Sequence, residues 1–329
     1  MPCFHPLIGY KRPSTGQWIS EKYAPLNHNM EPLTIPCNKC TGCRSEYSRQ
    51  WAMRIKHEYD WQQKLGRNST FITLTYNEKN LPSVGSLEKK DFQLFMKRLR
   101  KLKKSNKSNP LRFYACGEYG DRSNRPHYHA ILFNCTFKKD AEIANKGKDK
   151  LYYSQELQDV WSNLIKKPNT YEPIGFASWG TVTFESAQYV AGYVQKKING
   201  KQKDEHYKRY VSPDEYGELQ LDKNSNEEFQ LQQEFSLMSR KPGIASDWLT
   251  AYKDDIYPSD FITINGRKMR PPLYYDRQYQ RTHADEMEAI KEIRKQKAIE
   301  TEHLRTPEVL AYLEQKHKAR MSLYKRGKL

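Results

Sequence analysis

Between residues 71 and 197, short runs rich in β-branched and aromatic residues alternate with longer runs that have helical periodicity. The first kind predicts strands and the second predicts helices with one apolar face. The predicted strands are 71–76, 111–116, 127–133 and 176–184, and the predicted helices are 86–104, 154–164 and 186–197. This β-α-β-β-α-β-α order predicts an α+β fold with an antiparallel, ferredoxin-like sheet that has helices packed on one face.

The segments on either side of this core differ from it in composition. The sequence predicts a Cys-rich N-terminal extension that ends in a helix from Ser45 to about Leu65, and a helical C-terminal extension. The predicted domains are a Cys-cluster segment and helix (1–66), a core (67–200), a polar mobile insertion (201–234), a packing segment with a hairpin around Asn265-Gly266 (235–284), and a charged helix and tail (285–329).

The formal net charge of +17 indicates an anionic partner, because a charge of this size opposes compaction unless it is neutralised. The sequence contains no apolar run long enough for a membrane-spanning helix, and its start does not resemble a signal peptide. We therefore expect nucleic acid rather than a membrane as the partner, and a cytoplasmic location. The chain also has 23 tyrosines, many beside Lys or Arg, which suits unstacked single strands. The alternative is a basic protein whose charge only aids solubility.

The predicted strand 127–133 carries a His-x-His motif, His127-Tyr128-His129. Alternate residues of a strand face the same side, so both imidazoles can reach one metal ion. Glu118 ends the preceding strand, and antiparallel pairing through the 121–126 turn would bring it near His127. Mixed nitrogen and oxygen ligation suits Mg²⁺ or Mn²⁺ when a phosphate completes the shell. Two alternatives stay open: the same triad also suits the Fe(II) of an oxygenase, and Glu118 can instead pair with an arginine of the turn.

The predicted helix 186–197 carries two tyrosines, Tyr189 and Tyr193, four residues apart and so on one face. Lys196 and Lys197 continue that face. A tyrosine hydroxyl can attack phosphorus and form a covalent phosphotyrosine, and a nearby ammonium stabilises the developing negative charge. The alternative is that aromatic residues at this spacing only pack on the core.

Three cysteines, Cys37, Cys40 and Cys43, have C-x₂-C-x₂-C spacing, and Cys3 is a candidate fourth ligand. Four thiolates predict a closed structural Zn²⁺ site that ties the N-terminus to the helix that follows. The alternatives are an iron–sulfur cluster, free thiols, or His5 or His57 in place of Cys3. Cys116 and Cys135 are predicted to be small apolar residues of the sheet.

Together these motifs resemble the HUH endonuclease superfamily, in which a two-histidine strand motif accompanies nucleophilic tyrosines. More closely, the chain resembles the replication initiation proteins of microviruses of the gokushovirus group. The supporting segments are Met1–His5, the cysteine cluster leading into Arg49–Ala52, and Ser239–Ile244. This resemblance covers most of residues 1–280 and does not extend to the last 45 or so. The sequence shows no P-loop, so a fused helicase is not expected.

The resemblance implies an HUH-type sheet and a metal-dependent nickase that starts and ends rolling-circle replication. Tyr189 or Tyr193 would become joined to a 5′ phosphate of single-stranded origin DNA, and a host polymerase and helicase would use the freed 3′ hydroxyl. The expected DNA contacts are Arg98 and Lys101 of the basic helix, and Arg122 and Arg125 of the turn. The rival interpretations are a transposase or relaxase of the same superfamily, and a single-strand-binding protein without catalysis.

Overall fold

The computed structural model of the chain describes residues 3–25, 29–30, 32–121, 123–143, 150–164, 170–182, 184–192, 202–264 and 266–323. These residues form two compact units. One unit combines the described residues up to Ser48 with those from Asp276 onward, and the other runs from Arg49 to Tyr275. The five-part division drawn from the sequence is finer than this and stays a prediction.

The larger unit is built on a seven-stranded sheet in the order β14-β4-β5-β3-β10-β7-β6. Every pair of neighbours in it is antiparallel. The strands are β3 (Ser69–Thr75), β4 (Arg112–Tyr119), β5 (Pro126–Phe133), β6 (Ala141–Ile143), β7 (Leu151–Tyr153), β10 (Ala177–Thr181) and β14 (Phe235–Met238). The predicted α+β class with an antiparallel sheet is thereby confirmed.

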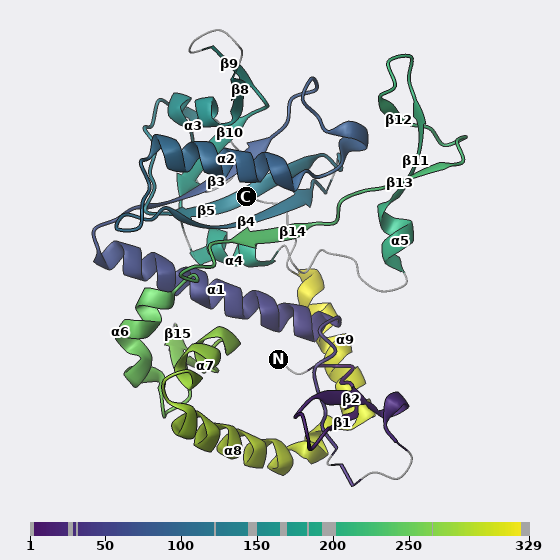
Figure 1. The fold of residues 1–329 in the computed structure, drawn as a ribbon, viewed down its shortest axis with the longest axis vertical. Coiled ribbons are helices and arrows are strands. Elements are labelled where there is room, and N and C mark those ends of the chain that lie inside the picture. Colours follow the sequence, from purple (N-terminus) through teal and green to yellow (C-terminus); the bar gives the residue numbers. More distant parts are fainter. Residues whose placement is uncertain are drawn as a thin grey trace. The chain divides into compact units, whose positions relative to one another are not determined.

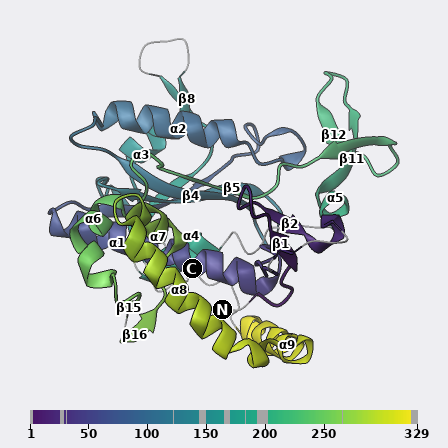
Figure 2. The same cartoon turned by 60° about the horizontal axis from the view of Figure 1, so that its bottom comes forward.

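Helices cover both faces of this sheet, not one face as predicted (Figure 1, Figure 2). Helices α2 (Lys89–Leu102) and α3 (Gln155–Val160) pack on one face. On the other face lie α4 (Phe184–Gly192) and the part of α1 (Thr41–Lys64) from Arg49 onward. The central strand β5 explains the difference. Its Leu132 joins the first apolar cluster while Ile131 joins the second, so both faces must be shielded from water.

One predicted helix ends earlier than expected. The helix predicted over 154–164 stops at Val160, and Trp161 leaves the helical conformation. The indole N–H of Trp161 donates to the carbonyl of Thr75, 2.7 Å away, and the ring is fully buried. The chain then forms β8 (Ser162–Leu164), which pairs with β9 (Tyr171–Pro173). Tertiary packing of the indole thus overrides the local helical pattern.

The polar segment 201–234, predicted to be a mobile insertion, contains regular structure. It holds α5 (Gln202–Tyr207) and a three-stranded sheet of β11 (Lys208–Pro213), β12 (Leu219–Leu221) and β13 (Glu227–Gln230). The following segment contains α6 (Ser246–Ile256) and the predicted hairpin, β15 (Ile262–Ile264) with β16 (Arg267–Met269). A short 3-10 turn, η2 (Ser83–Gly85), precedes α2.

The smaller unit contains the hairpin of β1 (Gly9–Lys11) and β2 (Trp18–Ser20), and the first turns of α1. Its other elements are η1 (Glu21–Tyr23), the end of α7 (Leu273–Gln280), α8 (Ala284–Glu300), η4 (Glu302–Arg305) and α9 (Pro307–Leu323). Within the described ranges of the whole chain, no helix has the length and apolar character needed to cross a membrane.

Candidate active site

Strands β4 and β5 bring the predicted metal ligands together on one face of the sheet. Their register sets Glu118 directly opposite His127, and Cys116 opposite His129. Because side chains alternate along a strand, Glu118 and both histidines face the side of the sheet that α1 and α4 cover. The antiparallel pairing that the sequence predicted through the 121–126 turn is therefore confirmed.

The three side chains form a tight group. Glu118 Oε1 lies 2.7 Å from His127 Nε2 and 3.2 Å from His129 Nε2. Their candidate ligand atoms all lie within 4.8 Å of one another. The Glu118 side chain is 3% exposed, and those of His127 and His129 are 17% and 10% exposed. Two imidazoles and a carboxylate thus line a site that is largely shielded from solvent but still accessible to it.

Hydrogen bonds to the Nδ1 atoms, on the side away from Glu118, orient the two imidazoles. His127 Nδ1 lies 3.1 Å from the carbonyl of Arg125, which can only accept, so Nδ1 donates and Nε2 faces Glu118. His129 Nδ1 lies 2.9 Å from the hydroxyl of Thr73. This contact leaves Nε2 of His129 as the nitrogen that faces Glu118. Such outer partners are typical of histidines that bind metal through the other nitrogen.

The carboxylate of Glu118 is held in its ionised form. Burial alone would raise its pKa, but the hydrogen bonds from His127 and His129 together outweigh burial and lower the pKa to about 2. The alternative pairing with Arg125 is wrong, because that guanidinium pairs with Glu78 and donates to the carbonyl of Tyr76. Arg122 lies outside the described residues. The donor set of two nitrogens and one anionic oxygen fits a divalent cation with room for a further ligand.

Helix α4, which carries Tyr189, packs on the same sheet face as the histidines. Its Ala187, Val190 and Ala191 belong to the apolar cluster that also contains Ile131 of β5. The Tyr189 side chain is outside the described part of the structure, and so are Tyr193, Lys196 and Lys197 as whole residues. The tyrosine–lysine motif therefore stays a prediction, on a helix whose described portion lies over the expected face.

The residues predicted to contact DNA divide between the two faces. Arg125 lies beside the histidines. Arg98 belongs to α2 on the opposite face, where its Nε donates to the carbonyl of Val160 at 2.9 Å. Burial lowers the pKa of that guanidinium. Lys101, on the same helix, is exposed. A DNA strand that contacted Arg125 as well as Arg98 and Lys101 would have to pass around the edge of the sheet.

Two residues near the site were not predicted from the sequence. Thr73 pairs with His129 across β3 and β5, and only the strand register reveals it. Phe176 precedes β10, and its carbonyl accepts from the backbone N–H of Thr75 at 2.9 Å. Thr75 is in turn opposite His127, and the Phe176 side chain is 74% exposed. Strand alternation places this ring on the histidine face, since Ala177 belongs to the other cluster.

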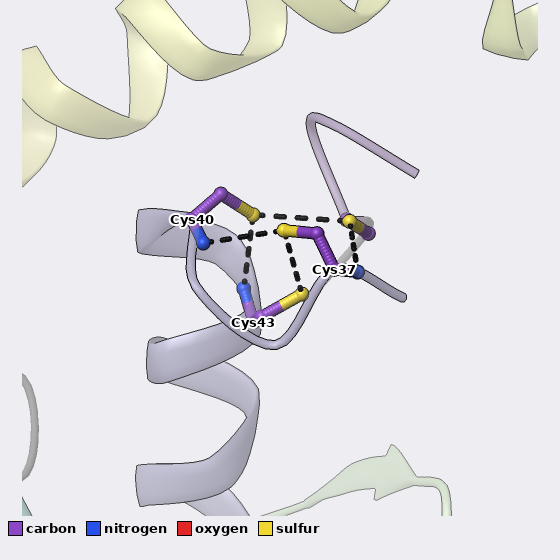
Figure 3. A group of neighbouring side chains, drawn as sticks. Cys37, Cys40 and Cys43 are labelled. Carbon is purple, nitrogen blue, oxygen red and sulfur yellow. Dashed lines mark hydrogen bonds between the residues drawn. The ribbon is translucent and has the colours of Figure 1, made fainter. Parts of the chain in front are cut away.

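In the smaller unit, the four cysteines of the predicted zinc site converge, and Figure 3 shows three of them at the start of α1. The alternative ligands lie elsewhere: His5 pairs with Glu314, and His57 bonds to Tyr275. Burial raises the pKa of Cys40, but backbone N–H groups of Cys43 and Phe4 outweigh it and lower the pKa to about 6. The remaining thiols are buried as predicted: Cys116 lies in β4, and Cys135 lies two residues beyond the end of β5.

The fold and the site define a class of protein: an α+β protein whose antiparallel sheet presents two imidazoles and a carboxylate at a candidate metal site. Residues 69–198, which include this site, match the family described as replication-associated protein ORF2/G2P. The match begins at β3 and extends past the end of α4, so it spans both the histidine and the tyrosine motifs.

The chain as a whole is similar to replication-associated proteins of phages. It is 28% identical to replication-associated protein VP4 of Bdellovibrio phage phiMH2K, over 87% of this chain and 79% of the relative. It is also 28% identical to replication-associated protein ORF2 of Spiroplasma virus 4, over 92% of this chain and 88% of the relative. A third relative, replication-associated protein ORF4 of Chlamydia phage 1, is 30% identical over 50% of this chain and 38% of its own length. No solved structure was found to match. The resemblance to microvirus replication initiators is thereby confirmed.

Proposed function

We propose that the chain is a replication initiator that nicks single-stranded DNA at an origin and later rejoins it into a circle. The observation that carries this proposal is the Glu118–His127–His129 group on the sheet face that α4 covers. The similarity to phage replication-associated proteins supports a role in replication and hence DNA binding. The net charge of +17 supports an anionic partner.

The proposed reaction is a phosphoryl transfer between oxygens. The phenolate oxygen of Tyr189 or Tyr193 attacks the scissile phosphorus, the bond from phosphorus to the 3′ oxygen breaks, and that oxygen takes a proton to become a free hydroxyl. The product is a 5′-phosphotyrosine. In the reverse step the 3′ hydroxyl attacks the phosphotyrosine, and the phenol leaves. The number of phosphoester bonds is unchanged, so no nucleotide cofactor is needed.

The chain's own groups each have a role in this proposal. Glu118, His127 and His129 would hold Mg²⁺ or Mn²⁺, which when bound polarises a non-bridging phosphate oxygen and helps to align the scissile bond. Lys196 and Lys197 would stabilise negative charge on the phenolate and at phosphorus. Arg125, and on the opposite face Arg98 and Lys101, would contact backbone phosphates, as would Arg122.

In this proposal, the exposed ring of Phe176 is a further contact with single-stranded DNA. Two inter-strand steps separate Phe176 from His127, about 10 Å in the sheet direction. That is the scale of one nucleotide, so a base next to the scissile phosphate can stack on this ring. Two tyrosines would serve two successive transfers, with a host polymerase and helicase acting between them in the host cytoplasm. The thiolate group of the smaller unit would hold a structural Zn²⁺.

A covalent-capture experiment tests this function. A single-stranded oligonucleotide pool labelled at the 3′ end is incubated with the protein and Mn²⁺, and the mixture is denatured. We expect label to stay on the protein, to disappear in the Tyr189→Phe, Tyr193→Phe double variant, and to persist in the control Tyr216→Phe. His129→Ala should abolish labelling while most DNA retention persists, because phosphate contacts supply most of the affinity.

The outcomes separate the rival functions. Retention of DNA without covalent label in Mg²⁺ or Mn²⁺ would favour a single-strand-binding protein without catalysis. Label that survives in the double variant would show that another residue is the nucleophile. If labelling occurs but product circles never form on an origin-containing strand, a transposase or relaxase becomes the better interpretation.

A further inference from the structure

The four cysteines of the smaller unit have the spacing of a mononuclear metal site. Cys3 Sγ lies 3.9 Å from Cys40 Sγ, and Cys37 Sγ lies 4.0 Å from Cys43 Sγ. A tetrahedral Zn²⁺ with Zn–S bonds of about 2.3 Å separates its sulfurs by roughly 3.8 Å. A disulfide needs a sulfur separation of about 2.05 Å, so neither pair is a disulfide. An iron–sulfur cluster sets iron and sulfide between its thiolates and so spreads them further apart.

Backbone N–H groups point at these sulfurs in a chain of contacts. Those of Cys37, Cys40 and Cys43 donate to the sulfurs of Cys3, Cys37 and Cys40, at 3.2, 3.3 and 3.5 Å. The N–H of Phe4 also donates to Cys40 Sγ, at 3.4 Å. Figure 3 shows Cys37, Cys40 and Cys43 at the start of α1 with the contacts among the drawn cysteines. These dipoles offset the negative charge that four thiolates retain around one divalent cation.

Residues next to the ligands contact the C-terminal helix α9. Phe4 follows Cys3, and its buried ring packs on the imidazole of His317 with ring centroids 5.6 Å apart. His317 Nε2 lies 3.0 Å from the hydroxyl of Ser45, two residues after Cys43. His5 Nε2 pairs with Glu314 Oε2 at 2.9 Å. Both ends of the ligand loop therefore meet one turn of α9.

Helix α9 has little apolar surface of its own with which to hold this position. Among its described residues, Leu310 and His317 are the buried ones. Its place in the unit therefore depends on the contacts of His317 and Glu314 with the segments that carry Cys3 and Cys43. If those segments separate, the surface that receives α9 is lost.

We infer that Cys3, Cys37, Cys40 and Cys43 bind one Zn²⁺, and that this ion fastens the C-terminal helix α9 to the start of the chain. The ion holds residues 3–5 against the first turns of α1, and these two segments together form the surface on which α9 packs. The inference concerns the smaller unit and does not depend on the nuclease chemistry proposed for the sheet. It gives the C-terminal extension a role that the sequence alone did not reveal.

The first test measures metal content. We expect about one zinc per chain in the purified protein, its loss in Cys37→Ser, and its retention in the control Cys135→Ala, whose thiol is buried in the larger unit. Co²⁺ in place of zinc should give the thiolate charge-transfer and tetrahedral visible bands of a four-sulfur site. Iron and inorganic sulfide in the purified protein, or neither metal, would overturn the site. His129→Ala should keep its zinc, so this result is separate from the nuclease assay.

The second test measures the link to α9 on the wild-type chain. Trypsin cleavage after Lys316, Lys318 and Arg320 should be at least about tenfold faster after the metal is removed with a chelator. Adding Zn²⁺ should restore protection, and adding Mg²⁺ should not. His317→Ala should release α9 to a similar extent but retain about one zinc. Cleavage in α9 that is unchanged on metal removal would overturn the link even if zinc is present.

Discussion

At the residue scale, the hydroxyl of Thr73 determines which ring nitrogen of His129 faces the candidate metal site. It lies 2.9 Å from Nδ1 and so leaves Nε2, 3.2 Å from Glu118, as the nitrogen that faces the metal site. Thr73→Val removes the hydroxyl at nearly constant volume. We expect Mn²⁺ affinity to fall by roughly 10- to 100-fold, because an outer partner fixes the tautomer and the basicity of the ligand. Titration of Mn²⁺ followed by electron paramagnetic resonance measures this.

Thr75→Val is the matched control for that substitution. Thr75 belongs to the same strand and face, but its hydroxyl donates to the carbonyl of Phe176 at 3.3 Å and not to an imidazole. Mn²⁺ affinity should change little. Equal losses in the two variants would mean that a strand-wide disturbance, and not the tautomer of His129, controls the site.

The exposed ring of Phe176 makes a separate prediction about DNA. Phe176→Ala should weaken binding of a short single strand by roughly 5- to 150-fold, the worth of one base stacked on an aromatic ring. Phe176→Tyr should retain the affinity. Fluorescence anisotropy without divalent metal measures this apart from cleavage. Tyr216→Ala, which removes an 83% exposed ring far along the chain, is the control, and an equal loss there would contradict a specific stacking role.

At the element scale, α1 carries a histidine that the fold keeps neutral. His57 Nδ1 lies 2.8 Å from the hydroxyl of Tyr275, and the ring stacks on Trp248 with centroids 3.5 Å apart. Burial, and to a lesser extent the charge of Lys56, lowers the pKa of His57 to about 3. The unfolded chain therefore binds a proton below about pH 6.5 that the folded chain does not accept until about pH 3.

The sign of the effect on stability follows from that difference. The free energy of unfolding should be greatest above pH 6.5 and should fall as pH drops toward 3, by about 2 kcal/mol between pH 7 and pH 5 from this group. Urea unfolding at the two pH values measures the loss. His57→Gln should reduce the pH dependence by that amount, whereas the exposed His206→Gln should not change it. An unchanged slope in His57→Gln would mean that His57 titrates normally in the folded protein.

At the scale of the whole molecule, the net charge of +17 should dominate DNA affinity. The logarithm of the binding constant for single strands should fall linearly with the logarithm of salt concentration, with a slope of roughly −0.7 for each phosphate contacted. Arg125→Ala should make this slope shallower by about 0.7. Lys291→Ala is the control, because its ammonium pairs with Glu288 on α8. A slope that Arg125→Ala leaves unaltered would remove Arg125 from the DNA interface.

The sequence by itself determined features that depend on local periodicity. The two-residue repeat of a strand was enough to set His127 and His129 on one face, and C-x₂-C-x₂-C spacing was enough to gather three thiols at the start of a helix. The antiparallel α+β class followed from the order of these local patterns. Each of these properties is encoded within a few residues.

Only the tertiary structure decided which distant residues meet. Thr73 opposite His129, Phe176 beside Thr75, and helices on both faces of the sheet follow from strand register and from burial on two sides. The contacts of α9 with Phe4 and Ser45 likewise join residues near the two ends of the chain. No local pattern encodes these neighbours, because they are chosen by the packing of the whole apolar core, to which every element contributes.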